Sequence, residues 1–187
     1  VIEENIIDSN LWQRTASVTY ILNQIKGGLL IGKNQILNNE SPREGGSLEV
    51  IYLGTGNTDV HVVANLVANN YIDTFGKFQF INYVNSAFTS TNETNICNNT
   101  VHFQSNLKHR YGAVGIYDQE NQKTKITGNI FYFDCPNTQY AWPVVIKHQS
   151  TSNPGQFEID HNSYYLNAVA INSFLGFIPL TFNPSKL

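Results

Sequence analysis

The side chains best suited to chemistry in this sequence are a carboxylate, an ammonium group and an imidazole at the ends of two apolar segments. Asp118 ends one segment, and Lys147 and His148 end another. Within reach of one another, these groups could remove a proton from a sugar acid, because positioned acid and base side chains transfer protons in the transition state. They are therefore the candidate catalytic residues, provided that the fold brings the two segments side by side.

Aromatic and basic side chains near this group could bind the substrate. Tyr83 and Tyr117 are candidate stacking platforms for sugar rings. Arg110, followed by Tyr111, could bind the carboxylate of an acidic sugar through two parallel hydrogen bonds, in a bidentate contact. A plainer alternative stays open, in which the polar residues form ordinary cross-strand pairs on a solvated face and Arg110 lies in a solvated loop.

The segments that would position these residues recur along the chain. Four alternating stretches carry an isoleucine at the same place, at Ile51, Ile81, Ile116 and Ile146, so the interval is equal for the first and last pairs and slightly longer between them. Such alternation is typical of β-strands with one buried face. Paired side by side, the strands would align one column made of Tyr52, Asn82, Tyr117 and Lys147, and a second column made of Tyr83, Asp118 and His148.

A second recurring pattern is an asparagine with an apolar residue three positions before it and another two positions after it. Its anchors are Asn34, Asn70, Asn99, Asn129 and Asn162, which follow one another at similar but not identical intervals. A period of roughly 30 residues indicates a repeat architecture, in which each unit buries its apolar face against its neighbours. Asparagine suits a turn that recurs in every unit, because it tolerates left-handed backbone angles and its amide can bond along a stack.

These patterns predict an all-β fold. No unit has a helical pattern, each is too short for the four strands of a propeller blade, and the leucines are too sparse for a leucine-rich repeat. We expect a single-stranded parallel β-solenoid of about five coils over residues 28–166, a capping segment over 1–27 and an exit segment over 167–187. Two inward columns are expected, namely Ile31, Val67, Ile96, Ile126 and Ile159, and Ile36, Ile72, Val101, Phe131 and Tyr164.

The composition indicates a polar but weakly charged surface. Charged residues make up 13% of the 187 residues, against about a quarter in average proteins, and 25 asparagines outnumber the 14 acidic residues. A net charge of −3 gives no broad attraction for nucleic acid, and no apolar run reaches the roughly 18 residues of a membrane span. We expect no nucleic-acid partner, no membrane span, and an extracellular or cell-surface location.

The ends of the chain and its cysteines complete these expectations. The chain has no methionine and opens without a signal-peptide pattern, so we expect a removed signal or a piece of a longer polypeptide. The rest of that polypeptide, or other chains, should cover the strand edges at the solenoid ends.

Cys97 and Cys135 occupy different places in the repeat, which favours free thiols and leaves a disulfide open. No cofactor or metal site is expected, and Ca²⁺ stays open without support.

The asparagine pattern resembles that of the right-handed parallel β-helix family, which includes the pectate lyases. Its best matches are Ile96-Cys97-Asn98-Asn99-Thr100-Val101 and Ile126-Thr127-Gly128-Asn129-Ile130-Phe131. The segment 157–165, with Asn162-Ser163-Tyr164-Tyr165 followed by the phenylalanine-rich stretch 174–182, is similar to late coils of large secreted or cell-surface β-helix proteins of Bacteroidota-type bacteria. The resemblance implies a right-handed coil. The family includes polysaccharide lyases, glycoside hydrolases, phage tailspikes, adhesins and inert stalks, so the fold leaves the function open.

Two functions from different classes follow. The first is a structural or adhesive role, in which a rigid segment presents an Asn-, Tyr- and Thr-rich surface to glycans. The alternative is a carbohydrate-active enzyme, a polysaccharide lyase or glycoside hydrolase that uses the outward face of the strands. The 11 Lys and Arg residues are few and spread out, whereas a lyase needs several basic groups to hold a polyanionic substrate. This favours the first function.

Overall fold

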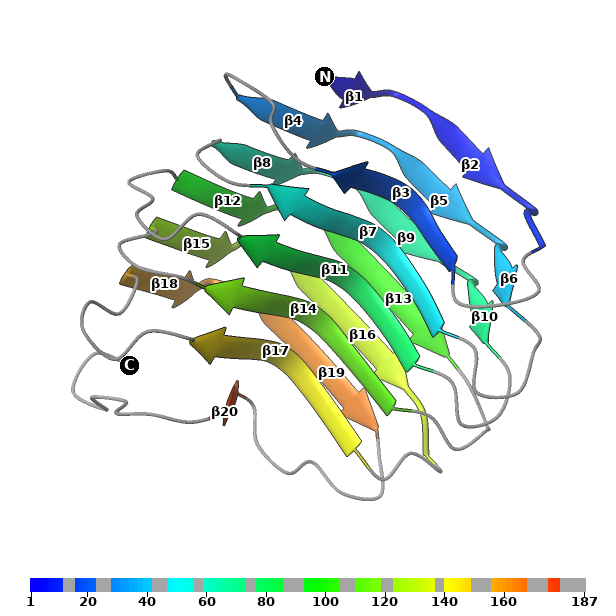
Figure 1. The fold of residues 1–187 in the computed structure, drawn as a ribbon. Coiled ribbons are helices and arrows are strands. Elements are labelled where there is room, and N and C mark those ends of the chain that lie inside the picture. Colours follow the sequence, from blue (N-terminus) through cyan, green and yellow to red (C-terminus); the bar gives the residue numbers. More distant parts are fainter. Residues whose placement is uncertain are drawn as a thin grey trace.

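The computed structural model describes residues 1–11, 16–22, 28–41, 47–55, 59–72, 77–85, 93–104, 110–118, 123–136, 140–148, 156–167 and 175–178. Within these ranges the chain is all-β, contains no helix, and pairs its strands in parallel (Figure 1). The expected all-β class is therefore confirmed.

Three large sheets hold six parallel strands each. Sheet 1 comprises β1 (Ile2–Glu3), β4 (Leu29–Gly32), β8 (Val60–Val63), β12 (Glu93–Cys97), β15 (Lys123–Thr127) and β18 (Gln156–Asp160). Sheet 2 comprises β2 (Ile6–Asp8), β5 (Gln35–Leu37), β9 (Leu66–Ala68), β13 (Thr100–Gln104), β16 (Ile130–Asp134) and β19 (Ser163–Asn167). Sheet 3 comprises β3 (Ala16–Leu22), β7 (Ser47–Thr55), β11 (Lys77–Asn85), β14 (Arg110–Asp118), β17 (Tyr140–His148) and β20 (Leu175–Ile178). A fourth, two-stranded sheet pairs β6 (Glu40–Ser41) with β10 (Tyr71–Ile72).

In chain order, one strand of sheet 1, one of sheet 2 and one of sheet 3 follow each other, and these three strands form a unit. Each unit pairs with the units before and after it, so six units replace the five expected. The additional unit lies in residues 1–27, where β1, β2 and β3 pair with the second unit instead of forming a separate capping segment. Pairing also continues beyond residue 166, because β20 joins β17.

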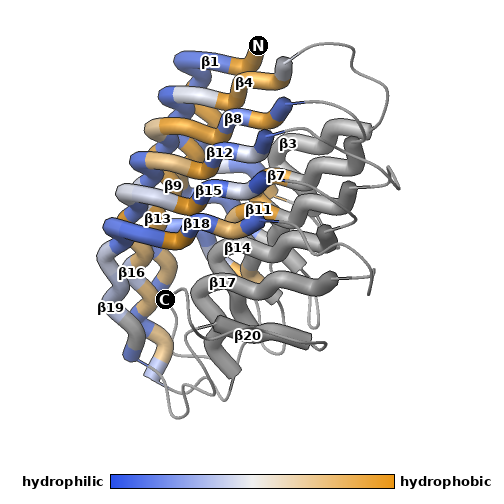
Figure 2. The backbone as a smooth tube through the Cα atoms, turned by 90° about the vertical axis from the view of Figure 1, so that its left-hand side faces the viewer, coloured by the Kyte–Doolittle hydropathy of each residue, from blue (hydrophilic) through white to orange (hydrophobic). Residues whose placement is uncertain are grey.

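The core consists of apolar columns that run through successive units. In sheet 1 the register aligns the buried Ile31, Val62, Ile96 and Ile126. In sheet 2 it aligns the buried Ile36, Val67, Val101 and Phe131. In Figure 2, apolar residues accordingly recur at the same place in neighbouring strands of these two sheets. The expected columns were wrong in the third unit, where Val62 and Val67 take the places assigned to Val67 and Ile72.

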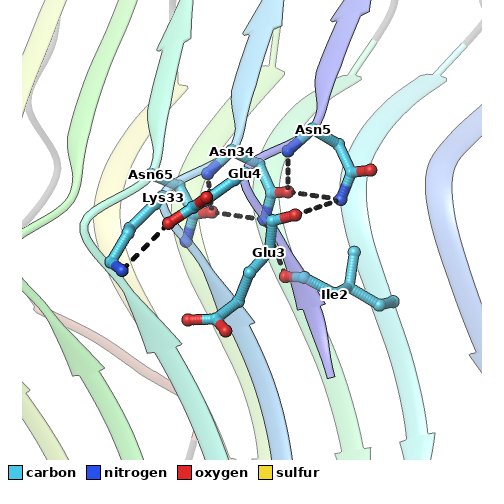
Figure 3. A network of polar contacts seen from close by, with 7 residues as sticks. All are labelled: Ile2, Glu3, Glu4, Asn5, Lys33, Asn34 and Asn65. Atoms are coloured by element: carbon cyan, nitrogen blue, oxygen red, sulfur yellow. Dashed lines mark hydrogen bonds and ion pairs between the residues drawn. The ribbon is translucent and has the colours of Figure 1, made fainter.

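The hydrogen bonds of the asparagines explain why the columns of the third unit were predicted wrongly. A file of six asparagines runs through all units, and the amide of each of the first five donates to the Oδ1 atom of the next one over 2.8–3.0 Å. Its members are Asn5, Asn34, Asn65, Asn99, Asn129 and Asn162. The backbone N–H of each of the first five also donates to the same Oδ1 atom, and Figure 3 shows the first three members. Four of the five anchors predicted from the sequence belong to this file, and the fifth, Asn70, does not.

Asn70 belongs to a second file, which joins Asn10, Asn39 and Asn70 over 2.9 Å contacts. In the first three units the two files are five residues apart, so both Asn65 and Asn70 satisfy the apolar-x-x-Asn-x-apolar pattern. In the second and third units, β5 and β9 are three residues long, and the chain then turns at Asn39 and Asn70. In the fourth and fifth units, the equivalent strands β13 and β16 are each five residues long.

The left-handed backbone conformation lies one residue before each file asparagine, and not on the asparagine as expected. Among the described residues, positive φ angles of 52–59° occur at eight non-glycine positions, and Gly128 has a φ of 67°. The eight are Glu4, Ser9, Lys33, Asn38, Ala64, Asn69, Asn98 and His161. The file asparagine therefore supplies hydrogen bonds at the turn, while its preceding neighbour supplies the left-handed angle.

The strands of sheet 3 share an interruption in their pairing. The register passes from Gln79 paired with Glu49 to Ile81 paired with Ile51 without a pair at Phe80, and β14 and β17 omit Pro143 in the same way. Phe80 and Ile81 are nevertheless both buried. Consecutive buried residues indicate that the strand bends there, since a regular strand alternates its faces. Pro143 fits this position because proline has no N–H to donate.

The first and last units are less buried than the middle ones. Ile2 and Ile7 in the first unit, and Phe157, Ile159 and Tyr164 in the last, are only partly buried, although their equivalents in the middle units are buried. Cys97 and Cys135 are free thiols, as favoured by the sequence. Cys135 is buried, whereas Cys97 is half-buried, and burial raises the pKa of the Cys97 thiol.

Candidate functional site

The predicted catalytic residues lie on two neighbouring strands of sheet 3. The register pairs Asp118 on β14 with His148 on β17, and Tyr117 with Lys147. On these neighbouring strands, a residue with a carboxylate thus lies beside one with an imidazole, and a residue with a phenol lies beside one with an ammonium group (Figure 1). The side chains of these four residues lie outside the described part of the structure, so their mutual contacts stay a prediction.

The third strand of this predicted cluster is displaced. Tyr83 on β11 pairs with Ile116 and not with Asp118, because Ile81 pairs with Val114 where the sequence suggested Ile116. The columns expected from the isoleucine anchors therefore break between Asn82 and Tyr117. The error equals two residues, and a shift of two leaves the alternation of strand faces unchanged. Alternation alone therefore could not have revealed it.

Arg110 lies apart from the predicted catalytic residues. It is the first residue of β14, where it pairs with Tyr140, and is not in a loop as expected. Asp118 is the last residue of the same nine-residue strand. The structure therefore does not bring Arg110 together with Asp118, Lys147 and His148, and a substrate carboxylate held by Arg110 would lie at the other end of the strand.

A different group of side chains gathers on the outward face of sheet 2. The register aligns His102 on β13, Tyr132 on β16 and Tyr165 on β19. The rings of Tyr132 and Tyr165 stack with centroids 4.3 Å apart and planes 8° apart. The ring of His102 meets Tyr132 edge-on, with centroids 4.8 Å apart. We call these three residues the aromatic row.

Polar side chains flank the aromatic row. Gln104, Asp134 and Asn167 align two residues further along the same strands. The amide of Asn167 donates to an Oδ1 atom of Asp134 over 2.8 Å. Desolvation is the main cause that raises the pKa of Tyr132, and the nearby Tyr165 and Asp134 raise it further. Tyr132 therefore keeps its phenolic proton at neutral pH and can donate a hydrogen bond.

The sequence contains a signal for the aromatic row that the isoleucine pattern obscured. His102, Tyr132 and Tyr165 each follow a file asparagine by three positions, after Asn99, Asn129 and Asn162. In the first three units this position holds Asp8, Leu37 and Ala68. An aromatic residue at one repeat position in three successive units predicts a ring stack on adjacent strands.

The described residues hold neither a cluster suited to a metal ion nor a membrane-spanning helix. They contain no cluster of three or more His, Cys, Asp or Glu side chains that could hold a metal ion. Asp160 and His161 are 3.0 Å apart on the surface, but no third such group of the described residues joins them. A helix long and apolar enough to cross a membrane does not occur among the described residues either.

Comparisons were made with models of protein families, with curated proteins and with solved structures. None of the three returned a match to this chain. The resemblance to parallel β-helix proteins therefore rests on the repeat itself.

Proposed function

We propose that the chain is a segment of a right-handed parallel β-helix with a structural or adhesive, glycan-binding role in an exported or cell-surface protein. The continuous file of six asparagines supports the β-helix part of this proposal, because it requires the chain to return to the same corner in every unit. Right-handedness is supported by the strong preference for right-handed connections between parallel strands of one sheet.

A rigid segment fits the pattern of contacts. Every large sheet runs through all six units, and the buried columns and asparagine files follow the same direction. Each unit contacts mainly its two neighbours, as in other repeat proteins. Such a rod presents its outward side chains at a regular spacing, which suits contact with a repetitive partner.

The alternative is a polysaccharide lyase or glycoside hydrolase, and one observation favours it. The register beside β17 pairs Asp118 with His148 and Tyr117 with Lys147. A base and an acid on neighbouring strands are the groups that a proton abstraction needs. Against it, Arg110 lies at the other end of β14, and the chain has 11 Lys and Arg residues in all.

An assay that measures binding and turnover together separates the two functions. We expect the protein to bind a polysaccharide from a panel of neutral and acidic chains without releasing new reducing ends or unsaturated sugars. The enzyme would instead release such products, and the substitutions His148→Ala and Lys147→Ala would abolish their release. Product release that is lost in these two variants would therefore replace the adhesive proposal with the enzymatic one.

We further propose that other parts of a longer polypeptide, or other chains, cover the two ends of the segment. The partial burial of Ile2 and Ile7 at one end and of Phe157 and Ile159 at the other supports this, because their equivalents in the middle units are fully covered. Exposed strand edges also favour pairing with further strands. The measurement is the molar mass in solution by light scattering, and a stable, monodisperse monomer of these 187 residues would contradict the proposal.

A further inference from the structure

The outward face of sheet 2 combines apolar and hydrogen-bonding groups in adjacent columns. Ile130 and Tyr165 expose 49% and 47% of their surface, which is high for large apolar or aromatic residues. Beside them, the phenol of Tyr132 and the side chains of Gln104, Asp134 and Asn167 offer donors and acceptors. A ligand that matches this face must have apolar patches and many hydroxyl groups, which is the chemistry of a carbohydrate.

The ring geometry decides how such a ligand would be held. Tyr132 and Tyr165 turn one face towards each other, so the row presents ring edges and hydroxyl groups to solvent. Tyr165 lies on β19, the edge strand of sheet 2. Hydrogen bonds to sugar hydroxyls would therefore dominate along the row, and apolar contact would come from Ile130 and the ring edges.

The charge of this face restricts the kind of carbohydrate. The strands of sheet 2 contain no lysine or arginine, and their acidic residues are Asp8 and Asp134. Asp134 lies directly beside the aromatic row, so it would repel uronate or sulfate groups. The face therefore favours a neutral polysaccharide over a polyanionic one.

The spacing of the row fits a chain molecule. Neighbouring strands of a sheet lie roughly 4.8 Å apart, and this distance is comparable with the length that one pyranose unit adds to an extended polysaccharide. The aromatic row spans three successive units, from β13 to β19. A polysaccharide running across these strands would meet an equivalent set of side chains at each sugar.

We propose that the aromatic row binds a neutral polysaccharide that lies across β13, β16 and β19, with about one sugar per strand. This proposal rests on the proposed glycan-binding function and adds to it the residues, the class of glycan and the direction of the bound chain. The row lies on sheet 2, whereas the residues predicted from the sequence lie on sheet 3, so the two locations can be tested separately.

The test is affinity electrophoresis of the whole chain in gels that contain β-glucan, xylan, galactomannan or, as the anionic comparison, polygalacturonate. We expect retardation by at least one neutral polysaccharide. Tyr132→Ala and Tyr165→Ala should weaken the affinity for it about tenfold or more. Tyr132→Phe, which keeps the ring and removes the hydroxyl, should weaken it several-fold and serves as the variant least disturbing to the fold. Circular dichroism would verify that each variant is folded.

The matched control is Tyr71→Ala, because Tyr71 is also a partly exposed tyrosine, at 39%, but lies on β10 outside sheet 2. It should leave the retardation unchanged. Retardation that survives all three variants of the row, or that occurs with polygalacturonate alone, would overturn the inference and leave the wider glycan-binding function standing. Absence of binding to every polysaccharide would overturn both. A change from oligomer to monomer in Tyr165→Ala, without any binding, would assign the row to contact between copies and overturn the inference as well.

Discussion

Replacing Asn99 by alanine is expected to lower the free energy of unfolding by about 4 kcal/mol. The Asn99 side chain is fully buried, and its Oδ1 atom accepts from both the backbone N–H and the amide of Asn65, at 3.0 and 2.9 Å. Its own amide donates to the carbonyl oxygen of Val62 and to Oδ1 of Asn129. Alanine would leave two buried donors of Asn65 without an acceptor, at about 1–3 kcal/mol each. Urea unfolding followed by circular dichroism measures the loss.

Two other asparagines provide the controls. Asn95→Ala, on the same unit, removes a half-buried side chain whose amide contacts His61 over 3.2 Å, and it should change stability by less than about 0.5 kcal/mol. Asn5→Ala removes the amide bonds to Oδ1 of Asn34 and to the carbonyl oxygen of Glu3 but keeps the backbone N–H bond to Asn34. Asn5 is exposed, so water can replace the lost amide bonds, and the substitution should cost about 1 kcal/mol. Equal losses for Asn99 and Asn5 would show that burial of the file does not determine its contribution.

Replacing Phe103 by alanine is expected to cost about 4 kcal/mol, because it removes a fully buried ring from a packed core. The Phe103 ring stacks on Phe78 with centroids 4.2 Å apart and planes 9° apart, and it lies 6.5 Å from Phe133. Phe78 belongs to β11 of sheet 3 and Phe103 to β13 of sheet 2. The pair therefore joins two sheets, and the cavity left by alanine would weaken their packing. Chemical unfolding again measures the effect.

Two further variants separate the effect of cavity size from the effect of the residue's position in the sheet. Phe103→Leu keeps most of the apolar volume and should cost roughly 1–2 kcal/mol, since the site stays partly filled. Leu66→Ala lies on the outward face of the same sheet, where the side chain is 38% exposed, and should cost less than about 1 kcal/mol. A loss for Phe103→Ala as small as that for Leu66→Ala would contradict the packing described for the core.

The fold class could be predicted because the repeat expresses a local requirement. A buried asparagine at a turn must find partners for its amide, and the residues around it must point into the core. Ile96, Asn99 and Val101 satisfy these conditions within six residues, so the sequence reveals them. The same pattern failed at Asn70, because the third unit turns twice and both Asn65 and Asn70 meet the local conditions.

The candidate site was harder to predict, because it depends on register between distant strands. Ile81 on β11 pairs with Val114 on β14, whereas the isoleucine pattern suggested a pair with Ile116, two positions further on. Loop length sets this register, and an even error conserves the pattern of faces. The aromatic row was predictable in principle, since each of its residues follows a file asparagine by the same number of positions in the sequence. Its assignment to sheet 2, however, requires that the turns at Asn99 and Asn129 are located first.

The asparagine files and the three large sheets also determine how the molecule would respond to force. The hydrogen bonds between neighbouring asparagines of a file, and those between neighbouring strands of a sheet, join one unit to the next. Tension applied between the two ends would therefore load the junctions between units in series. The weakest junction would then yield first while the others stay intact. The first unit joins the second through strands of two and three residues in sheets 1 and 2, whereas the fourth, fifth and sixth units share five-residue strands there. A pulled molecule would therefore lose its first unit early and hold its aromatic row the longest.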